Sequence, residues 1–247
     1  MREAMLKVLW LGHASFRLET PCGKVLYIDP WFQNPVCPLK ETPTDADFVF
    51  VTHGHFDHIS SVPELMEKCP QAKLVCSGEM HTFFMQVHKI PDSRMHRMNK
   101  SGHVDFSFGR VSMVQADHSS SCGMHDGVFW DGGNAVGFVL KINNSRTVYH
   151  SGDTGIFGDM GLINELHKPD VLLICTGGNF TMGPEEASLA INKFFKSAEV
   201  VIPMHFKTFP PLLPDTFPQL KEGLANAGWS GRLVDSYEEV LGKTIEL

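Results

Sequence analysis

Short runs of apolar residues recur along the whole chain, and clusters of Gly, Pro, Asn and Asp separate them. Most runs are rich in Val, Ile, Leu and Phe, which is typical of strands buried on both faces. They predict strands at residues 7–11, 24–28, 48–52, 73–76, 110–115, 135–142, 146–150, 170–175 and 199–204.

Helical patterns fall between some of these runs. A Ser-Val-Pro-Glu capping box predicts a helix over residues 61–69, and residues 158–168 predict a second. Pro184 opens a third, and residues 215–228 form a fourth with Gly228 as its C-terminal cap. Strands mixed with helices indicate an α/β layered fold. Because no linker or repeat interrupts the pattern, we expect residues 1–247 to form a single domain.

The longest irregular stretch covers residues 119–134 and reads SSSCGMHDGVFWDGGN. Long ordered loops in compact domains are usually functional, so this stretch is either a lid over a site or a surface insertion. We expect it to lack secondary structure.

The composition of the chain indicates which kinds of molecule it is expected to bind and in which compartment. The net charge of -7 argues against nucleic acid, because phosphate binding requires a basic face. No apolar run is long enough to cross a bilayer, and no signal peptide is evident. The six cysteines form no C-x-x-C pair, which is typical of thiols in a reducing compartment. We therefore expect a cytoplasmic protein with a small-molecule substrate and no nucleic-acid or membrane partner. Its oligomeric state stays open, a homo-oligomer included.

One stretch concentrates potential metal ligands. The apolar run at residues 48–51 ends abruptly, and His53, His55, Asp57 and His58 follow within a few residues. Two histidines one residue apart cannot share a helix face, but they converge in a tight loop, for which Gly54 supplies backbone freedom. A histidine-rich surface loop is the simpler alternative, and four ligands beside a buried strand make it the weaker one.

Five predicted strands deliver such side chains at their carboxyl ends. These are Asp29, His53, His118, Asp153 and His205. Open α/β sheets place their sites at this end of the strands. We therefore expect the five residues to meet.

Together these residues provide enough ligands for two metal ions. We assign His53, His55 and His118 to the first ion and Asp57, His58 and His205 to the second, with Asp153 bridging both. Zinc is the first choice, with manganese or iron as alternatives. A hydroxide between two such ions would be a nucleophile near neutral pH, because coordination lowers the pKa of bound water.

The order of these motifs resembles the metallo-β-lactamase superfamily. LGHAS, IDP, THGHFDH, a histidine followed by serines, HSGDTG, GGNFTMGPEEA and IPMH occur in this order between about residues 11 and 210. The similarity is greatest to a compact branch of metal-dependent hydrolases related to the ascorbate-6-phosphate lactonases. It implies a four-layer αββα sandwich with a dinuclear site on one edge. The implied activity is hydrolysis of a small ester, lactone or phosphodiester.

Three residues are candidates for catalytic roles, and one of them, Asp57, is also a predicted ligand. Asp57 is a candidate proton shuttle, since a metal carboxylate can also contact the attacking water. Asp29 suits the acceptor that orients a ligand histidine. His13 either contacts substrate or a ligand, or is a structural histidine. His150 is expected in the core or behind a ligand.

Gly178, Asn179 and Thr181 are candidate substrate contacts. They precede the helix that opens at Pro184, and free N–H groups at a helix start suit an anionic substrate. A helix cap alone would also explain this segment.

Two rival functions remain. A nuclease or phosphodiesterase acting on nucleic acid uses the same fold, although the acidic balance of this chain disfavours it. A di-iron redox protein is the other rival. Flavin-linked members of the superfamily carry glutamate where His55 stands, which disfavours that alternative here.

Overall fold

The apolar runs form the central strands of two stacked sheets. The computed structural model describes residues 5–247. The first sheet runs from edge to edge in the order β16 (Ile245–Glu246), β1 (Lys7–Trp10), β2 (Phe16–Glu19), β3 (Val25–Ile28), β4 (Phe48–Phe50), β5 (Lys73–Ser77) and β6 (Met95–Met98). The second runs β15 (Arg232–Leu233), β14 (Val200–Met204), β13 (Val171–Cys175), β12 (Thr147–His150), β11 (Val136–Ile142), β8 (Gly109–Gln115) and β7 (His103–Phe106).

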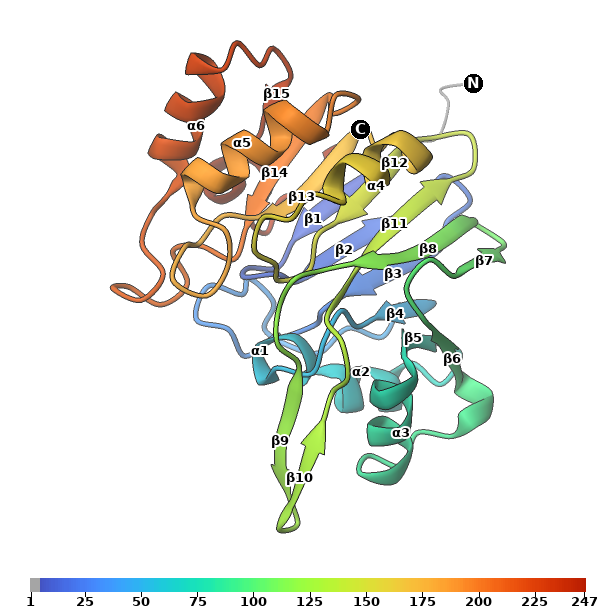
Figure 1. Cartoon of the computed structure of the whole chain (residues 1–247). Helices are drawn as coiled ribbons and strands as arrows, with labels where there is room; N and C mark the ends of the chain where they lie inside the picture. The colour runs from blue at the N-terminus through green and yellow to red at the C-terminus, as the bar shows by residue number, and fades with distance from the viewer. Residues whose placement is uncertain (1–4) are drawn as a thin grey trace.

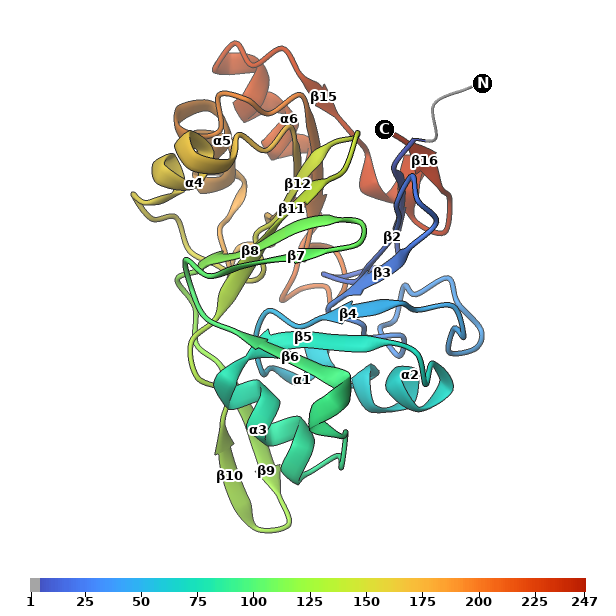
Figure 2. The same ribbon diagram turned by 90° about the vertical axis from the view of Figure 1, so that its right-hand side faces the viewer.

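Helices cover the outer face of each sheet (Figures 1 and 2). On the first sheet they are α1 (Phe56–Ile59), α2 (Val62–Lys68) and α3 (Gly78–Gln86); on the second they are α4 (Met160–His167), α5 (Pro184–Phe194) and α6 (Phe217–Asn226). Short helical turns lie at Asp92–Arg94 and Ser236–Val240. The expected αββα sandwich is therefore confirmed. No helix within residues 5–247 has the length and apolar character needed to span a bilayer.

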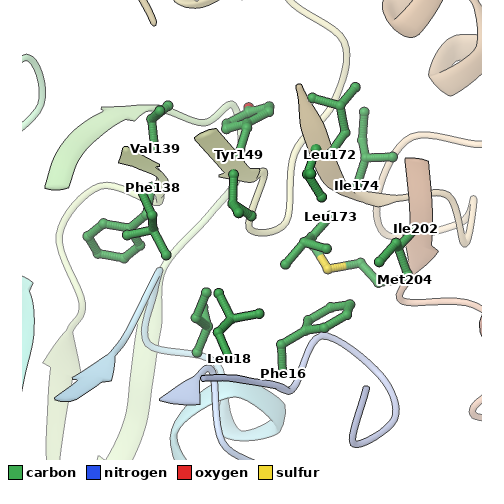
Figure 3. Close-up of a cluster of buried hydrophobic side chains, with 14 of the residues drawn as sticks. Phe16, Leu18, Phe138, Val139, Tyr149, Leu172, Leu173, Ile174, Ile202 and Met204 are labelled. Atoms are coloured by element: carbon green, nitrogen blue, oxygen red, sulfur yellow. The ribbon is translucent and has the colours of Figure 1, made fainter. Parts of the chain in front are cut away.

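The main core lies between the two sheets (Figure 3). Phe16 and Leu18 of β2 point toward the second sheet, where they meet Leu173 and Met204. Every residue of β13 is buried, because the opposite face of its sheet packs against helices. This two-sided burial explains why these strands read as continuous apolar runs.

Strand direction brings the carboxyl ends to one edge. In the first sheet β3 and β4 are parallel. In the second, β12, β13 and β14 are parallel, and β8 runs the same way because both β8 and β12 pair antiparallel with β11. The segments that follow these strands therefore gather at a single edge of the sandwich.

The predicted helices are present, with small differences at their ends. Gly228 lies just after α6 with φ +71°, and the Trp229 N–H bonds to the Leu224 carbonyl, as the predicted C-terminal cap requires. The predicted capping box at Ser61 is wrong. The Ser61 hydroxyl instead accepts from the Phe32 N–H, so it ties a neighbouring loop to the helix start.

Several elements were not predicted from the sequence. Helix α3 begins after Ser77, whose hydroxyl accepts from the Met80 N–H. The strands β2, β6, β7, β15 and β16 are short and partly exposed, so they lack the continuous apolar runs on which the prediction relied.

The expectation that residues 119–134 are irregular is wrong. They contain a hairpin of β9 (Ser121–His125) and β10 (Val128–Asp131), which projects away from both sheets (Figure 1). Its turn is Asp126-Gly127, and both residues have positive φ (+50° and +76°). This conformation suits the right-handed twist of paired strands, and Asp-Gly is a strong sequence signal for it. That signal could have been read from the sequence.

Candidate metal centre

The THGHFDH segment crosses the edge of the sandwich directly after β4. His53 and His55 lie in the loop, and His58 lies within α1. A Cβ on Gly54 would come within 2.9 Å of the Cys122 sulfur. Because Gly54 has no positive φ, its role is to leave space for the neighbouring hairpin rather than to supply the backbone freedom that we expected.

The first predicted ligand set is brought together. One nitrogen from each of His53, His55 and His118 lies within 4.8 Å of the others. His53 Nε2 is 3.0 Å from His55 Nδ1, and His118 approaches from the segment after β8. Three imidazole nitrogens at this spacing suit a borderline divalent ion.

The second predicted set lies beside the first. Asp57, His58 and His205 each offer an atom within 4.8 Å of the others. His13 belongs to the same group, with Nε2 2.9 Å from Asp57 Oδ2. His205 follows β14 directly and has φ +60°, an uncommon conformation for a residue other than glycine. Such backbone strain persists where the surrounding structure enforces it, commonly at functional sites.

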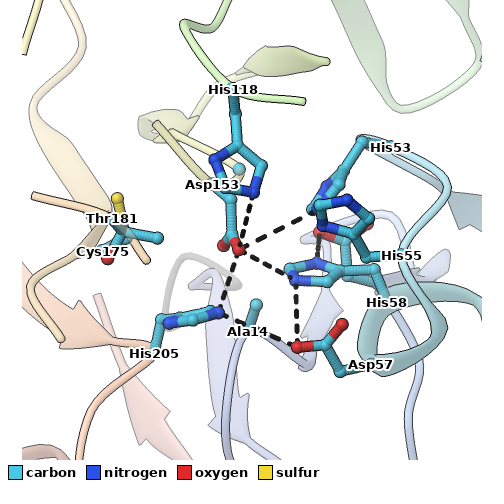
Figure 4. Close-up of polar contacts among 12 residues, drawn as sticks. Ala14, His53, His55, Asp57, His58, His118, Asp153, Cys175, Thr181 and His205 are labelled. Carbon is cyan, nitrogen blue, oxygen red and sulfur yellow. Dashed lines mark hydrogen bonds and ion pairs between the residues drawn. The ribbon is translucent and has the colours of Figure 1, made fainter. Parts of the chain in front are cut away.

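Asp153 lies between the two sets (Figure 4). Its Oδ2 is 2.9 Å from His205 Nε2 and 3.4 Å from His58 Nε2 on one side. On the other side it is 3.7 Å from His118 Nε2 and 3.9 Å from His53 Nε2. This is the position that a bridging carboxylate requires.

The chemistry of these atoms fits bound cations. The contacts of Asp153 Oδ2 with His58 Nε2 and His205 Nε2 are ion-pair contacts without hydrogen-bond geometry. In the part of the chain that the structure describes, these two nitrogens and Asp153 Oδ1 are therefore buried without a hydrogen-bond partner. Burial alone would lower the pKa of His58, yet the carboxylates of Asp153, Asp29 and Asp57 hold that pKa well above its usual value. This buried site favours positive charge and holds unpaired ligand atoms. Both properties suit metal ions.

Buried hydrogen bonds hold the ligands in place. Asp29 accepts from His58 Nδ1–H (2.8 Å) and from both the N–H and the hydroxyl of Thr52 (2.8 and 2.6 Å), contacts that the orienting role predicted for it requires. His13 contacts Asp57 rather than open solvent, since its ring is fully buried. This contact favours the ligand-orienting role over the substrate-contacting one. His150 is also fully buried, and its Nε2 lies 3.0 Å from the Ala14 carbonyl.

Gly178, Asn179 and Thr181 do not line the pocket beside the centre, although Thr181 lies near Cys175 behind it (Figure 4). Their segment already uses its amides within the protein. The N–H groups of Gly178 and Thr181 bond to carbonyls of the same loop, and the Gly183 N–H bonds to Glu186 Oε2 at 3.0 Å. This geometry favours the helix-cap interpretation of the segment. Its side chain in the pocket beside the centre is Phe180.

Comparison with known proteins identifies the family. A family model described as "Beta-lactamase superfamily domain" matches residues 7–205, which include all seven predicted ligands. The chain belongs to the β-lactamase superfamily. Within it, the chain belongs to the UPF0173 metal-dependent hydrolases. One such protein from Koribacter versatilis is 43% identical over 84% of this chain and 87% of its own length. Another from Staphylococcus aureus strain MRSA252 is 38% identical over 90% of this chain and 94% of its own.

Solved structures agree with this superfamily assignment. Igni18, described as a novel metallo hydrolase from Ignicoccus hospitalis, has a TM-score of 0.80 at 32% identity over 98% of this chain and 99% of its own. CmlA, a di-iron β-hydroxylase from Streptomyces venezuelae, has a TM-score of 0.70 at 11% identity, and the match covers 98% of this chain and 54% of that one. The likeness to CmlA shows the fold alone.

Sequence reasoning missed several residues of this superfamily site. The hydroxyl oxygen of Thr208 lies 3.1 Å from His13 Nδ1. Trp31 packs edge-on against the His13 ring at a centroid distance of 5.1 Å. Phe56 and Leu212 line the pocket beside the centre. Phe56 could have been found, because an aromatic residue between the predicted ligands of THGHFDH is itself a signal, whereas the other contacts join distant parts of the chain.

Proposed function

We propose that this protein is a hydrolase with two divalent metal ions, zinc first with manganese or iron as alternatives, acting on a small ester, lactone or phosphodiester. The observation that carries this proposal is the pair of ligand sets on either side of Asp153. His53, His55 and His118 would hold one ion, and Asp57, His58 and His205 the other. When bound, such ions polarise a scissile group and lower the pKa of water.

His13 and Asp57 supply the positioning and the proton transfer. His13 fixes Asp57 through the contact between its Nε2 and Asp57 Oδ2. Burial would raise the pKa of Asp57, but His58 and the hydrogen bond from His13 hold that pKa well below its usual value. Asp57 is therefore ionised at neutral pH, in the form that can accept a proton and pass it to the leaving group.

The first test measures metal content by mass spectrometry on protein purified without chelator, beside turnover of ester, lactone and phosphodiester substrates. We expect two zinc or manganese ions per chain and hydrolysis of at least one substrate class. Iron without hydrolysis would favour the redox alternative, and a metal-free protein that cannot be loaded would overturn the proposal.

The role of Asp57 is tested by Asp57→Asn. We expect turnover to fall about 100-fold or more while metal content stays close to two ions, because proton transfer by a placed side chain contributes this much. Asp126→Asn, at the exposed hairpin turn, is the control and should keep both quantities. Loss of one ion in Asp57→Asn would reduce the role of Asp57 to ligation.

The expected partners follow from the same site. A small molecule fits the pocket, and the net charge of -7 gives no support to a nucleic-acid substrate. The cysteines are unpaired, which supports a reducing compartment such as the cytoplasm.

A further inference from the structure

The pocket beside the metal centre is apolar over most of its wall. It encloses about 640 Å³, which is enough for a small molecule. Its polar end is formed by His55, Asp57, His118, Asp153 and His205, with Ser119 and Ser121 beside them. The rest of the wall includes Phe56, Phe180, Phe209, Leu212, Leu213 and Cys122. Of the residues that the structure describes, no lysine or arginine lines it.

Three of these apolar side chains face solvent around the pocket. Phe56 is 64% exposed, Phe180 53% and Leu212 56%. They come from three separate segments, at α1, before α5 and before α6. Single exposed apolar residues need no explanation, but their convergence on one pocket marks a surface that binds an apolar group.

The aromatic wall is fixed by packing. Trp31 is buried and packs against Phe56 with ring centroids 5.6 Å apart, and against Phe209 at 5.5 Å. Neighbouring aromatic rings in such contacts hold each other's orientation. On the side formed by Phe56 and Phe209, an apolar ligand therefore meets a surface that is already formed, so little conformational entropy is lost there on binding.

The charged side chains of the pocket disfavour a substrate with an anionic group distant from the metal ions. The carboxylates of Asp57 and Asp153 lie at its polar end. Two amides of the predicted anion-binding segment, those of Gly178 and Thr181, already bond to carbonyls of their own loop. Away from the ions, an anionic group would therefore meet these carboxylates and no lysine or arginine among the described residues that line the pocket.

We propose that the substrate is an uncharged ester or lactone that carries an aryl or alkyl group, which binds against Phe56, Phe180 and Leu212. This inference rests on the proposed hydrolase function. In the reaction the oxygen of water bonds to the acyl carbon, the ester C–O bond breaks, and the leaving alcohol takes a proton. The products are a carboxylic acid and an alcohol.

The test measures binding of straight-chain alkyl hydroxamates to zinc-loaded protein by calorimetry, from acetohydroxamate to octanohydroxamate. The hydroxamate group binds zinc, and the alkyl chain samples the wall. We expect affinity to rise about fourfold with each methylene that enters the pocket. The anionic monohydroxamate of succinic acid should bind more weakly than butanohydroxamate, which has the same number of carbons.

Matched variants locate the effect. Leu212→Ser should reduce the gain in affinity per methylene. Leu189→Ser, which changes a leucine of similar exposure on α5, should leave that gain unchanged. Equal affinity for all alkyl lengths, or a preference for the anionic compound, would overturn the apolar inference and leave the hydrolase proposal standing. Failure of every hydroxamate to bind, together with failure to retain zinc, would overturn both.

Discussion

At the scale of single residues, the two ring nitrogens of His13 have different roles. An ionised Asp57 only accepts hydrogen bonds, so Nε2 must carry the proton that it shares with Oδ2 at 2.9 Å. Nδ1 is then an acceptor. The single proton of the Thr208 hydroxyl can point to this nitrogen at 3.1 Å or to the Phe206 carbonyl at 3.3 Å, and an Nδ1 without a proton favours the first. Burial, assisted by His205, lowers the pKa of His13 to about 4, which keeps the ring neutral at pH 7. Thr208 thus fixes the tautomer that orients Asp57.

Thr208→Val tests this role. The substitution keeps the shape of the side chain but removes the hydroxyl, so we expect kcat to fall about tenfold, as for other residues that orient metal ligands. Thr208→Ser keeps the hydroxyl and should retain most of the activity. If the serine variant loses as much as the valine variant, Thr208 contributes packing rather than a hydrogen bond.

The buried ring of His150 makes the stability of the fold depend on pH. The Gly152 N–H donates to its Nδ1 at 3.1 Å, so the buried ring must be neutral with its proton on Nε2, toward the Ala14 carbonyl. Burial lowers the pKa of His150 below its ordinary value of 6.5. As the pH falls through 6.5, His150 therefore becomes protonated in the unfolded chain but stays neutral in the folded chain. The contribution of His150 to stability is complete above pH 6.5 and is lost as the pH falls below it.

The natural protein and His150→Gln should differ in how steeply their free energy of unfolding changes with pH. Between pH 6.5 and 5, the free energy of unfolding of the natural protein should fall more steeply than that of His150→Gln, by up to about 1.4 kcal/mol per pH unit. Denaturant unfolding at a series of pH values measures it. The two curves should run parallel above pH 7.5, and parallel curves at acid pH as well would contradict the assignment.

At the scale of elements, the loop after β13 must pass close to the loop after β14. A Cβ on Gly177 would lie 1.9 Å from the carbonyl oxygen of His205. No side chain fits in this space, so glycine at position 177 is what allows His205 to reach the centre.

Gly177→Ala should therefore displace His205. We expect turnover to fall more than tenfold and the free energy of unfolding to fall by about 1–3 kcal/mol, because the clash involves backbone on both sides. Gly158→Ala is the matched control, since a Cβ there meets open space. Normal activity in Gly177→Ala would show that the loops can separate without moving the ligand.

The elements also show why part of this site was predictable. A ligand that directly follows an apolar run, such as His53 or His205, is positioned by a strand that can be read locally. The Asp126-Gly127 hairpin was equally local and was missed because the length of the stretch outweighed its turn signal. The contact between His13 and Thr208 spans 195 residues, so only the packed sheets create it. The same is true of the aromatic wall around Trp31.

At the scale of the whole molecule, the centre joins the two halves of the sandwich. His53, His55, Asp57 and His58 follow a strand of the first sheet, whereas His118, Asp153 and His205 follow strands of the second. A backbone bond from the His205 N–H to the His13 carbonyl, at 3.0 Å, crosses the same boundary. Ions held here would bind only the folded chain, because unfolding separates the two groups of ligands.

Metal removal should therefore lower global stability. By mass action, an ion at 100 times its dissociation constant adds about 2.7 kcal/mol to the free energy of unfolding, which corresponds to a shift in Tm of roughly 5–10 °C for a chain of this length. Thermal unfolding of chelator-treated protein, titrated with zinc, measures the shift. His58→Ala should reduce it, whereas His103→Ala, an exposed histidine on β7, should keep it. A Tm that does not change at any zinc concentration would show that the folded protein does not hold ions between its sheets.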